Sequence, residues 1–308
     1  MTKILITGGS GFLGTHVVNA VKGYDIFVPR SNEYDLRRNY DTQQLFMTEK
    51  PNIVIHLAAT CGGIGANMNN PGQYFYDNIT MGVNVIDCCK GSGVSKIIMV
   101  GTVCSYPKHC AVPFSEDDLW YGFPEETNAP YGIAKKALYV MLEAYRKQYG
   151  LNSTVLIPSN LYGPCDNFKD ESSHVIPALI KKIHNAKTND SPTVEVWGDG
   201  TCTREFLYVK DAAEAIKNSI KVNTDSNPIN LGTGIEISIE DLVYKIKRIM
   251  NYEGEIIFNN KYPNGQPRRC VSTIKASKIL DFQAKYNLDI GLKETIDWYL
   301  TNKTPMLQ

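Results

Sequence analysis

Short runs of apolar residues recur through the first half of the chain and alternate with segments that have the spacing of amphipathic helices. The apolar runs predict strands at residues 4–7, 25–29, 52–59, 96–102 and 153–160. Helical spacing is found at residues 12–22, 74–90 and 131–149. Because the strands are apolar throughout, they fit a parallel sheet that is covered on both faces. The order of the elements predicts an α/β fold with a doubly wound parallel sheet.

This alternation breaks in a turn-rich segment at residues 161–173. Beyond it the sequence predicts strands at 194–198, 206–209 and 229–232, and helices at 174–187, from 211 and from 238. We expect the chain to leave the first sheet near residue 163 and to revisit it between residues 205 and 232. The remaining residues are expected to form a smaller α/β cap.

The composition is that of a folded protein without a strong charge bias. Of the 308 residues 43% are hydrophobic, and 32 basic side chains balance 32 acidic ones. Nucleic acid is not an expected partner, because binding it needs a concentrated basic surface. No apolar run reaches the roughly 18–20 residues of a membrane span. A strand that begins at Lys3 leaves no room for a secretion leader, and the eight cysteines include no CxxC pair. We therefore expect reduced thiols, a cytoplasmic protein and no metal site.

Three glycines follow the first predicted strand with the spacing G-x-x-G-x-x-G. Glycine permits a tight turn there, and the free N–H groups at the start of the next helix favour a pyrophosphate. A plain strand-to-helix turn is the alternative, but the position straight after the first strand favours dinucleotide binding. The turn assigns these residues to a cofactor: Gly8, Gly9, Ser10, Gly11, Phe12, Leu13 and Gly14.

Arg30 stands at the end of the second predicted strand, where an NAD site usually has an acidic residue that accepts from the ribose 2′-hydroxyl. A guanidinium suits a 2′-phosphate instead. Arg30 therefore favours NADP, with an ordinary surface arginine as the alternative.

Tyr131 and Lys135 are four residues apart, so a helix places them on one face. An ammonium beside a phenol is expected to lower the phenol's pKa, and the phenol can donate a proton to a carbonyl oxygen as hydride reaches the carbon. The Y-x-x-x-K spacing also occurs by chance on surface helices. The glycine turn and Thr102 support the catalytic interpretation of this spacing. Thr102 places a hydroxyl at the end of the fourth strand, and packing is its alternative role.

The combination of GGSGFLG, HLAA, Thr102 and YGIAK resembles the extended short-chain dehydrogenase/reductases, which act on nucleotide sugars. Longer segments resemble the GDP-L-fucose synthase branch of that family, most specifically SHVIPAL (173–179) and VWGDGTCTREF (196–206). The resemblance implies NADP(H) as the cofactor and a Rossmann-type domain of residues 1–163 and 205–232. It implies a GDP-sugar-binding domain of residues 164–204 and 233–308. It also implies a homodimer that pairs through a four-helix bundle.

The reaction implied by the resemblance is NADPH-dependent 3,5-epimerisation and 4-reduction of GDP-4-keto-6-deoxy-D-mannose to GDP-L-fucose. A C4 ketone acidifies the protons on C3 and C5, and Thr102 and Tyr131 can stabilise the resulting enolate. Cys104 and His174 match the family's proton-transferring cysteine and histidine. A buried core thiol and a helix cap are their alternative roles, but the flanking segments favour catalysis.

The resemblance assigns two further sets of residues. Those implied for the cofactor are Leu57, Ala58, Ala59, Val100, Gly101, Lys135, Pro158, Ser159, Asn160, Leu161 and His174. Those implied for the substrate are Lys182, Trp197, Arg204, Asn264 and Arg268, with core packing as the alternative for Trp197 and a solvated surface for Arg268.

Four positions depart from the family pattern: Asn32, Val103, Ser105 and Asn264. Asn32 replaces an arginine near the adenosine phosphate, which weakens the argument for NADP. The other three can alter which deoxyhexose is accepted. A 4-reductase or a single epimerase/reductase that makes another GDP-deoxyhexose is therefore the alternative function, and a non-catalytic NADP-binding sensor is a more remote one.

Overall fold

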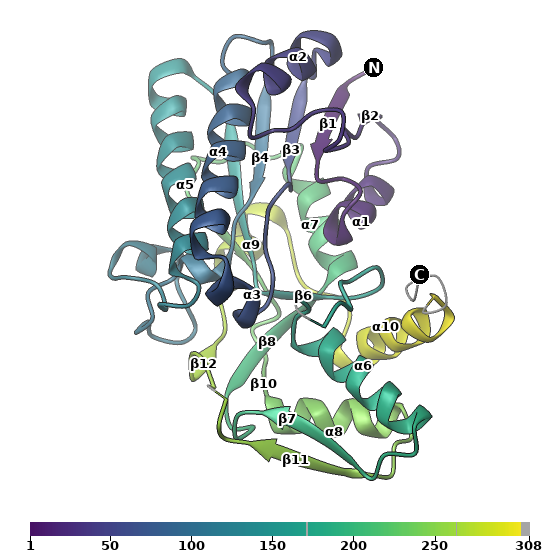
Figure 1. Ribbon diagram of the computed structural model, residues 1–308. Coiled ribbons are helices and arrows are strands. Elements are labelled where there is room, and N and C mark those ends of the chain that lie inside the picture. Colours follow the sequence, from purple (N-terminus) through teal and green to yellow (C-terminus); the bar gives the residue numbers. More distant parts are fainter. Residues whose placement is uncertain (171, 263, 303–308) are drawn as a thin grey trace.

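The computed structural model describes residues 1–170, 172–262 and 264–302. Glu171 of the turn-rich segment, Pro263 and residues 303–308 of the predicted cap lie outside the described residues. Figure 1 shows a larger part that contains the N-terminus and the longest helices, and a smaller part below it.

Six parallel strands form the larger sheet in the order β2-β1-β3-β4-β5-β9. Their bounds in that order are Asp25–Phe27, Lys3–Thr7, Ile53–His56, Lys96–Val100, Ser153–Pro158 and Ile229–Leu231. Since β1 lies between β2 and β3, the connections on its two sides run in opposite directions and open a crevice at the carboxyl ends of the strands. The predicted doubly wound parallel sheet is confirmed.

Helices cover both faces of this sheet (Figure 1). One face carries α2 (Asn39–Glu49), α4 (Pro71–Cys89) and α5 (Ala129–Tyr149), and the other carries α1 (Phe12–Ala20), α7 (Val209–Ser219) and α9 (Ile274–Leu280).

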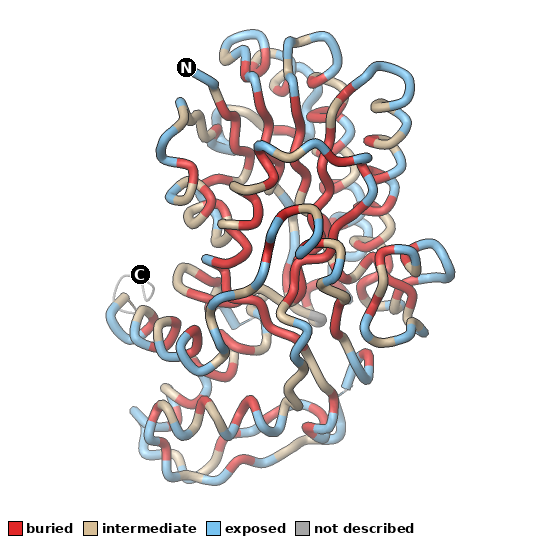
Figure 2. The backbone as a smooth tube through the Cα atoms, turned by 180° about the vertical axis from the view of Figure 1, so that it is seen from behind, coloured by how far each residue is buried: buried red, intermediate tan, exposed pale blue. Residues whose placement is uncertain are grey.

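The packing of the strand side chains explains why the strands are apolar throughout. In β1, Leu5 packs in the cluster with α2, α4 and α5, whereas Ile4 and Ile6 pack in the cluster with α1, α7 and α9. Successive side chains of a strand point to opposite faces, so both faces need apolar residues. The buried strands form the red centre of the larger part in Figure 2.

Two small sheets and three helices make up the smaller part. Strand β8 (Thr203–Tyr208) pairs with β10 (Glu236–Ser238), β12 (Arg268–Arg269) and β6 (Asn160–Tyr162), and β7 (Thr193–Trp197) pairs with β11 (Glu255–Asn259). An apolar cluster joins these sheets to α6 (Val175–Thr188), α8 (Ile239–Ile249) and α10 (Leu288–Asn302).

One expectation about connectivity is corrected by the sheet pairing. The strand predicted at 206–209 was expected to rejoin the larger sheet, but β8 belongs to the smaller four-stranded sheet. The chain revisits the larger part through α7, which packs on α1, and through β9, which pairs with β5. The sequence pattern also missed several elements, among them α2, α3 (Ile64–Asn69) and α10.

The eight cysteines are all free thiols. Within the described ranges, no helix combines the length and the apolar character needed to cross a membrane. The described side chains also contain no group of three or more histidines, cysteines or carboxylates arranged to hold a metal ion.

Candidate active site

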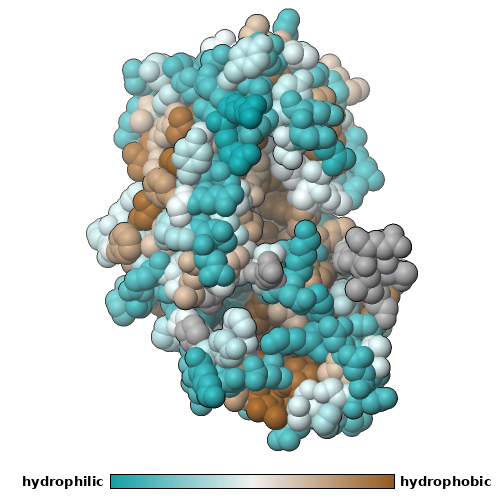
Figure 3. All heavy atoms as spheres, in the orientation of Figure 1, coloured by the Kyte–Doolittle hydropathy of each residue, from teal (hydrophilic) through white to brown (hydrophobic). Residues whose placement is uncertain are grey.

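A cavity of about 1040 Å³ runs from the glycine turn of the larger part to the ends of β7 and β8 in the smaller part. Figure 3 shows a recess between the two parts on one face of the molecule. Both halves of the fold therefore contribute side chains to one site.

The glycine turn brings backbone against the cavity. Gly8 has φ +70°, and a Cβ there would lie 2.7 Å from the backbone nitrogen of Ala58. A Cβ on Gly14 would lie 2.1 Å from the carbonyl oxygen of Gly8. No side chain caps the start of α1 at Gly11, so its first N–H groups are available to an anion. Gly9 lies behind the turn, against Val28, and does not line the cavity.

The remaining residues assigned to the cofactor line the same half of the cavity: Ser10, Phe12, Leu13, Leu57, Ala58, Ala59, Val100, Gly101, Pro158, Ser159, Asn160 and Leu161. Ser159 has a buried hydroxyl without a hydrogen-bond partner among the described residues. A buried polar atom of this kind indicates that a ligand supplies the partner. The available backbone N–H groups, the close-packed glycines and this hydroxyl fit a dinucleotide.

Arg30 is exposed and lies outside the cavity lining, which corrects its predicted position. The basic residue that lines this end is Arg37. Its guanidinium donates two hydrogen bonds of 2.9 Å to the Asp35 carboxylate and lies 3.4 Å from Asp77. Because these carboxylates already neutralise Arg37, it offers less positive charge to a ligand than an unpaired arginine.

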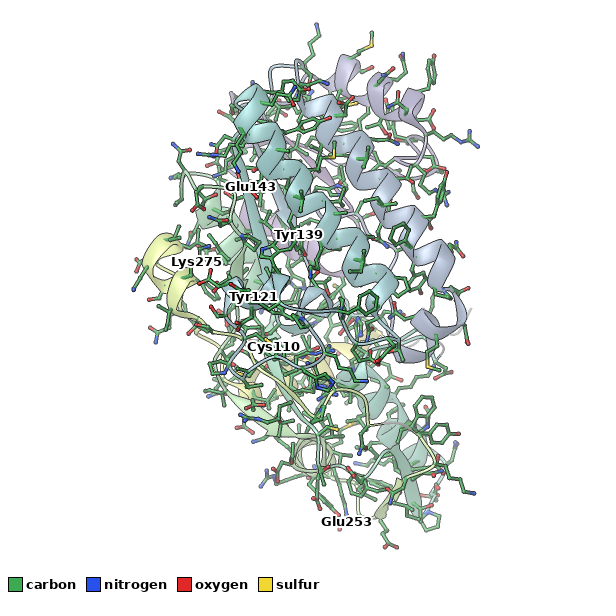
Figure 4. All side chains as sticks on the ribbon, turned by 90° about the vertical axis from the view of Figure 1, so that its left-hand side faces the viewer. Cys110, Tyr121, Tyr139, Glu143, Glu253 and Lys275 are labelled. Carbon is green, nitrogen blue, oxygen red and sulfur yellow. The ribbon has the colours of Figure 1, made fainter. Side chains whose placement is uncertain are left out.

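Tyr131, Lys135 and Thr102 meet in the middle of the cavity. The Lys135 Nζ lies 6.0 Å from the Tyr131 ring centroid and donates a 3.3 Å hydrogen bond to the carbonyl of Val100. Thr102 ends the turn after β4, where its hydroxyl accepts from the backbone N–H of Cys104. The phenol of Tyr139, which Figure 4 labels on α5, accepts from the Thr102 N–H at 3.1 Å. This hydrogen bond joins α5, which carries Tyr131 and Lys135, to the segment after β4 that carries Thr102.

The pKa of Tyr131 differs from the sequence expectation. Burial raises it well above the ordinary phenol value, and the nearby Cys61 and Cys104 act in the same direction, while hydrogen bonding to Thr102 acts against them. Burial also lowers the pKa of Lys135 to about 8. The expected lowering of the phenol pKa by the ammonium is therefore outweighed by desolvation. Tyr131 is held as the neutral phenol, which is the form that can donate a proton.

Cys104 and His174 also line the cavity. Cys104 Sγ lies 4.0 Å from the Arg269 guanidinium. His174 is at the N-cap position of α6, but its side chain does not cap the helix. His174 is an exposed residue of the cavity wall, and desolvation by the surrounding protein lowers the pKa of its imidazole, with the charge of Arg269 as the second cause. The helix-cap alternative for the His174 side chain is excluded.

Cys61 is a cavity residue that sequence reasoning missed. Burial raises the pKa of its thiol, with Lys135 opposing this and Cys104 adding to it. The loop that carries it is tied to the segment before His174, since the Gly63 N–H donates a 3.2 Å hydrogen bond to the carbonyl of Ser172. The sequence around Cys61 does not identify it as a site residue, because its position in the cavity depends on how β3 lies beside β4.

Two arginines face each other across neighbouring strands at the substrate end. In the pairing of β12 with β8, Arg269 lies opposite Arg204, and both line the cavity. Burial, together with the charge of Arg269, lowers the pKa of Arg204. Among the described residues, neither guanidinium has a carboxylate within 4.0 Å. Two unneutralised cations at one surface constitute a site for a multiply charged anion.

Arg268 has the opposite environment and is corrected as a site residue. It is exposed, forms an ion pair with Glu236 and does not line the cavity. Adjacent residues of a strand point to opposite sides, so only one arginine of this pair can face the site. Of the two arginines in this dipeptide, Arg269 lines the cavity and Arg268 does not.

Lys182, Trp197 and Asn264 line the far end of the cavity, as the resemblance implied. The ammonium of Lys182 lies 5.6 Å from the Trp197 ring centroid. Trp197 is 53% exposed, so the alternative of core packing does not describe it.

A glycine-turn dinucleotide site that adjoins a half-buried tyrosine and a buried lysine defines a nucleotide-dependent oxidoreductase of the Rossmann class. The family model described as the NAD dependent epimerase/dehydratase family matches residues 4–232. The chain belongs to this family.

Relatives resemble the chain over nearly its full length. A GDP-L-fucose synthase of Sinorhizobium fredii is 38% identical over 302 residues, which cover 97% of this chain and 96% of the relative. The structure of a GDP-L-fucose synthetase from Naegleria fowleri bound to NADP has a TM-score of 0.89 and 32% identity, covering 98% of this chain and 94% of that one. A GDP-6-OMe-4-keto-L-xylo-heptose reductase from C. jejuni has a TM-score of 0.91 and 29% identity, covering 97% and 98%.

Proposed function

We propose that this protein is an NADPH-dependent epimerase/reductase that converts GDP-4-keto-6-deoxy-D-mannose to GDP-L-fucose. The observation that carries the proposal is one continuous cavity, which joins the glycine turn and Tyr131 to the unneutralised Arg204 and Arg269. A dinucleotide fits one end, and the diphosphate of a nucleotide sugar fits the other. The names of the relatives support GDP as the nucleotide and NADP as the cofactor.

The phenol of Tyr131 donates its proton to the C4 oxygen of the substrate. Bound NADPH would supply the hydride that reduces C4. Lys135 holds a positive charge beside the phenol, and Thr102 offers a second hydroxyl toward the same oxygen. The glycine turn, Ser159 and the residues at the ends of β3, β4 and β5 bind the cofactor.

Cys104 and His174 exchange protons with C3 and C5. The ketone makes those protons acidic, and removal from one face with return on the other inverts the carbon. Burial lowers the pKa of His174, so its imidazole is neutral near pH 7 and can accept a proton. The Sγ of Cys104, the second proton-transferring group, lies 4.0 Å from the Arg269 guanidinium.

The domain organisation, the cellular location and the oligomeric state of the protein also belong to this proposal. We infer a cofactor domain built around the larger sheet from residues 1–159, 209–232 and α9, and a GDP-sugar domain built around β8 and β7. The free cysteines support a cytoplasmic protein. Figure 4 looks onto α4 and α5, which lie side by side on one flank. Their outward positions include the exposed Phe75, Tyr76 and Val140, which supports a homodimer that pairs through a four-helix bundle.

Product analysis in deuterated water tests the reaction. The protein is incubated with NADPH and GDP-4-keto-6-deoxy-mannose, and the sugar is identified by NMR. Deuterium at both C3 and C5 of GDP-L-fucose is the expected result. A Cys104→Ser variant is expected to lose deuterium incorporation while it retains some direct reduction, and equal loss of both activities contradicts the separate roles.

A reductase that acts on C4 alone is the second candidate. It is favoured by the likeness to the heptose reductase from C. jejuni and by Val103, where the family usually has a hydroxyl residue before the cysteine. Product that carries no solvent deuterium identifies this simpler reaction.

A further inference from the structure

Two exposed aromatic rings stack at the far end of the substrate half of the cavity. The rings of Trp197 and Tyr262 have centroids 4.2 Å apart and planes only 7° from parallel. Trp197 ends β7, and Tyr262 follows β11, the strand that pairs with β7. The ladder places Trp197 opposite Asn259, so the turn after β11 brings the Tyr262 ring onto the indole.

The two loops that carry these rings are fastened to each other. The N–H groups of Gly198 and Tyr262 both donate to the carbonyl of Asn259, at 3.0 Å and 3.3 Å. The Asn264 amide accepts from the Asp199 N–H at 3.0 Å and donates to the Asp199 carboxylate at 2.9 Å. These hydrogen bonds hold the two segments that carry the rings next to each other.

The stack presents an aromatic surface to the cavity. Trp197 is 53% exposed and lines the cavity, whereas Tyr262, 39% exposed, does not line it. The phenol ring covers one face of the indole, and the Lys182 ammonium lies over the ring, so a base that stacks on the other face takes the place of the Lys182 side chain there. Lys182, whose ammonium lies 5.6 Å from the indole centroid, places a positive charge at the same end. A planar base attached to phosphates matches a flat ring beside a cation.

We propose that Tyr262 is a positioning residue, which holds the indole of Trp197 in the orientation that stacks on the nucleotide base of the substrate. This inference rests on the proposed function, because it takes the ligand at this end to be the GDP portion of a nucleotide sugar. Tyr262 acts through Trp197 and does not contact the base. Its ring, and not its hydroxyl, performs the role, since the described contacts of Tyr262 with Trp197 are made by the ring.

The test is calorimetric titration of the full chain with GDP. Tyr262→Ala is expected to weaken GDP binding about 3–10-fold, the range that corresponds to one lost aromatic pair, while Tyr262→Phe binds like the unmodified protein. The decisive measurement is a double-mutant cycle with Trp197→Ala. If Tyr262 acts through the indole, Tyr262→Ala has no further effect once Trp197 is removed.

Controls separate this role from a general loss of structure. Tyr244→Ala, on α8 and outside the cavity, removes another half-exposed tyrosine and is expected to leave GDP binding unchanged. NADPH affinity, read from nucleotide fluorescence, is expected to be the same in all variants because its site is at the other end.

Three results overturn the inference. These are a Tyr262→Ala variant that binds GDP as tightly as the unmodified protein, a Tyr262→Phe variant that is weakened equally, and additive effects in the cycle. Failure of the unmodified protein to bind GDP overturns the proposed function together with the inference. The outcomes therefore distinguish the two claims.

Discussion

The two ends of the cavity achieve ligand binding by different means. The end under the larger sheet is built from backbone: close-packed glycines, uncapped N–H groups of α1 and a buried hydroxyl of Ser159. The end in the smaller part is built from side chains, namely the facing pair Arg204 and Arg269 and the ring of Trp197. Backbone recognition suits a ligand common to many enzymes, whereas side chains can change with the substrate. Tyr131 and Lys135 lie where the two ends meet.

Removal of the Tyr131 hydroxyl at this junction is expected to have the largest effect. The Tyr131→Phe variant keeps the ring but has no proton to donate, so kcat for ketone reduction is expected to fall by roughly 10²–10⁴-fold. NADPH and GDP affinities, measured by fluorescence and calorimetry, are expected to remain unchanged. Unaltered turnover with the authentic substrate contradicts the assignment of Tyr131 as the proton donor.

The contrast between the ends also explains what the sequence could predict. Gly8, Gly11 and Gly14 act within one turn, and Tyr131 and Lys135 within one helix, so their spacing along the chain is enough to find them. Arg269 and Tyr262 act through strand pairing with β8 and β7, which connects segments far apart in sequence. Local pattern does not contain that pairing. The larger sheet was likewise predictable from its apolar runs, whereas the membership of β8 was not.

Substitutions of the two arginines in β12 test the end of the cavity that is built from side chains. Arg269→Ala removes an unneutralised cation, and a charge-assisted contact with phosphate contributes about 1.5–3 kcal/mol, so GDP binding is expected to weaken roughly 10–100-fold. Arg268→Ala is the matched control. It removes an exposed arginine paired with Glu236 and is expected to change GDP binding by less than about 2-fold. Calorimetry on both variants decides, and equal losses contradict the assignment of the anion site to one side of β12.

The glycine turn tests the backbone end. Gly14→Ala adds a Cβ within 2.1 Å of the Gly8 carbonyl oxygen, so the turn has to shift away from the position that approaches the cofactor. Overpacking of this kind costs about 1–3 kcal/mol, and NADPH affinity is expected to fall about 5–100-fold while GDP affinity is retained. At Gly23 a Cβ meets no atom within 4 Å, so Gly23→Ala is expected to bind NADPH normally. Loss of GDP binding in Gly14→Ala shows that the two ends are not independent.

Asp166 lies in the turn after β6 and does not line the cavity. A substitution there shows what a buried polar group without a partner costs in a region that does not bind ligands. Burial raises the pKa of this carboxyl from 3.8 to about 7, and its Oδ2 has no partner among the described residues. Between about pH 4 and 7 the folded protein thus holds a proton that the unfolded chain has released. Stability is therefore expected to fall as pH rises through this range and to level off above it.

Asp166→Asn keeps an oxygen that can accept from the Asn167 N–H and removes the ionisation. Melting curves are expected to show equal stability of the two proteins near pH 4 and a gain of about 1–2 kcal/mol for the variant near pH 8. This is less than the full shift implies at about 1.4 kcal/mol per pKa unit, because a buried site relaxes around a charge. GDP and NADPH affinities are expected to be unchanged. A variant that is less stable than the unmodified protein at pH 8 shows that the carboxylate is satisfied in the folded state.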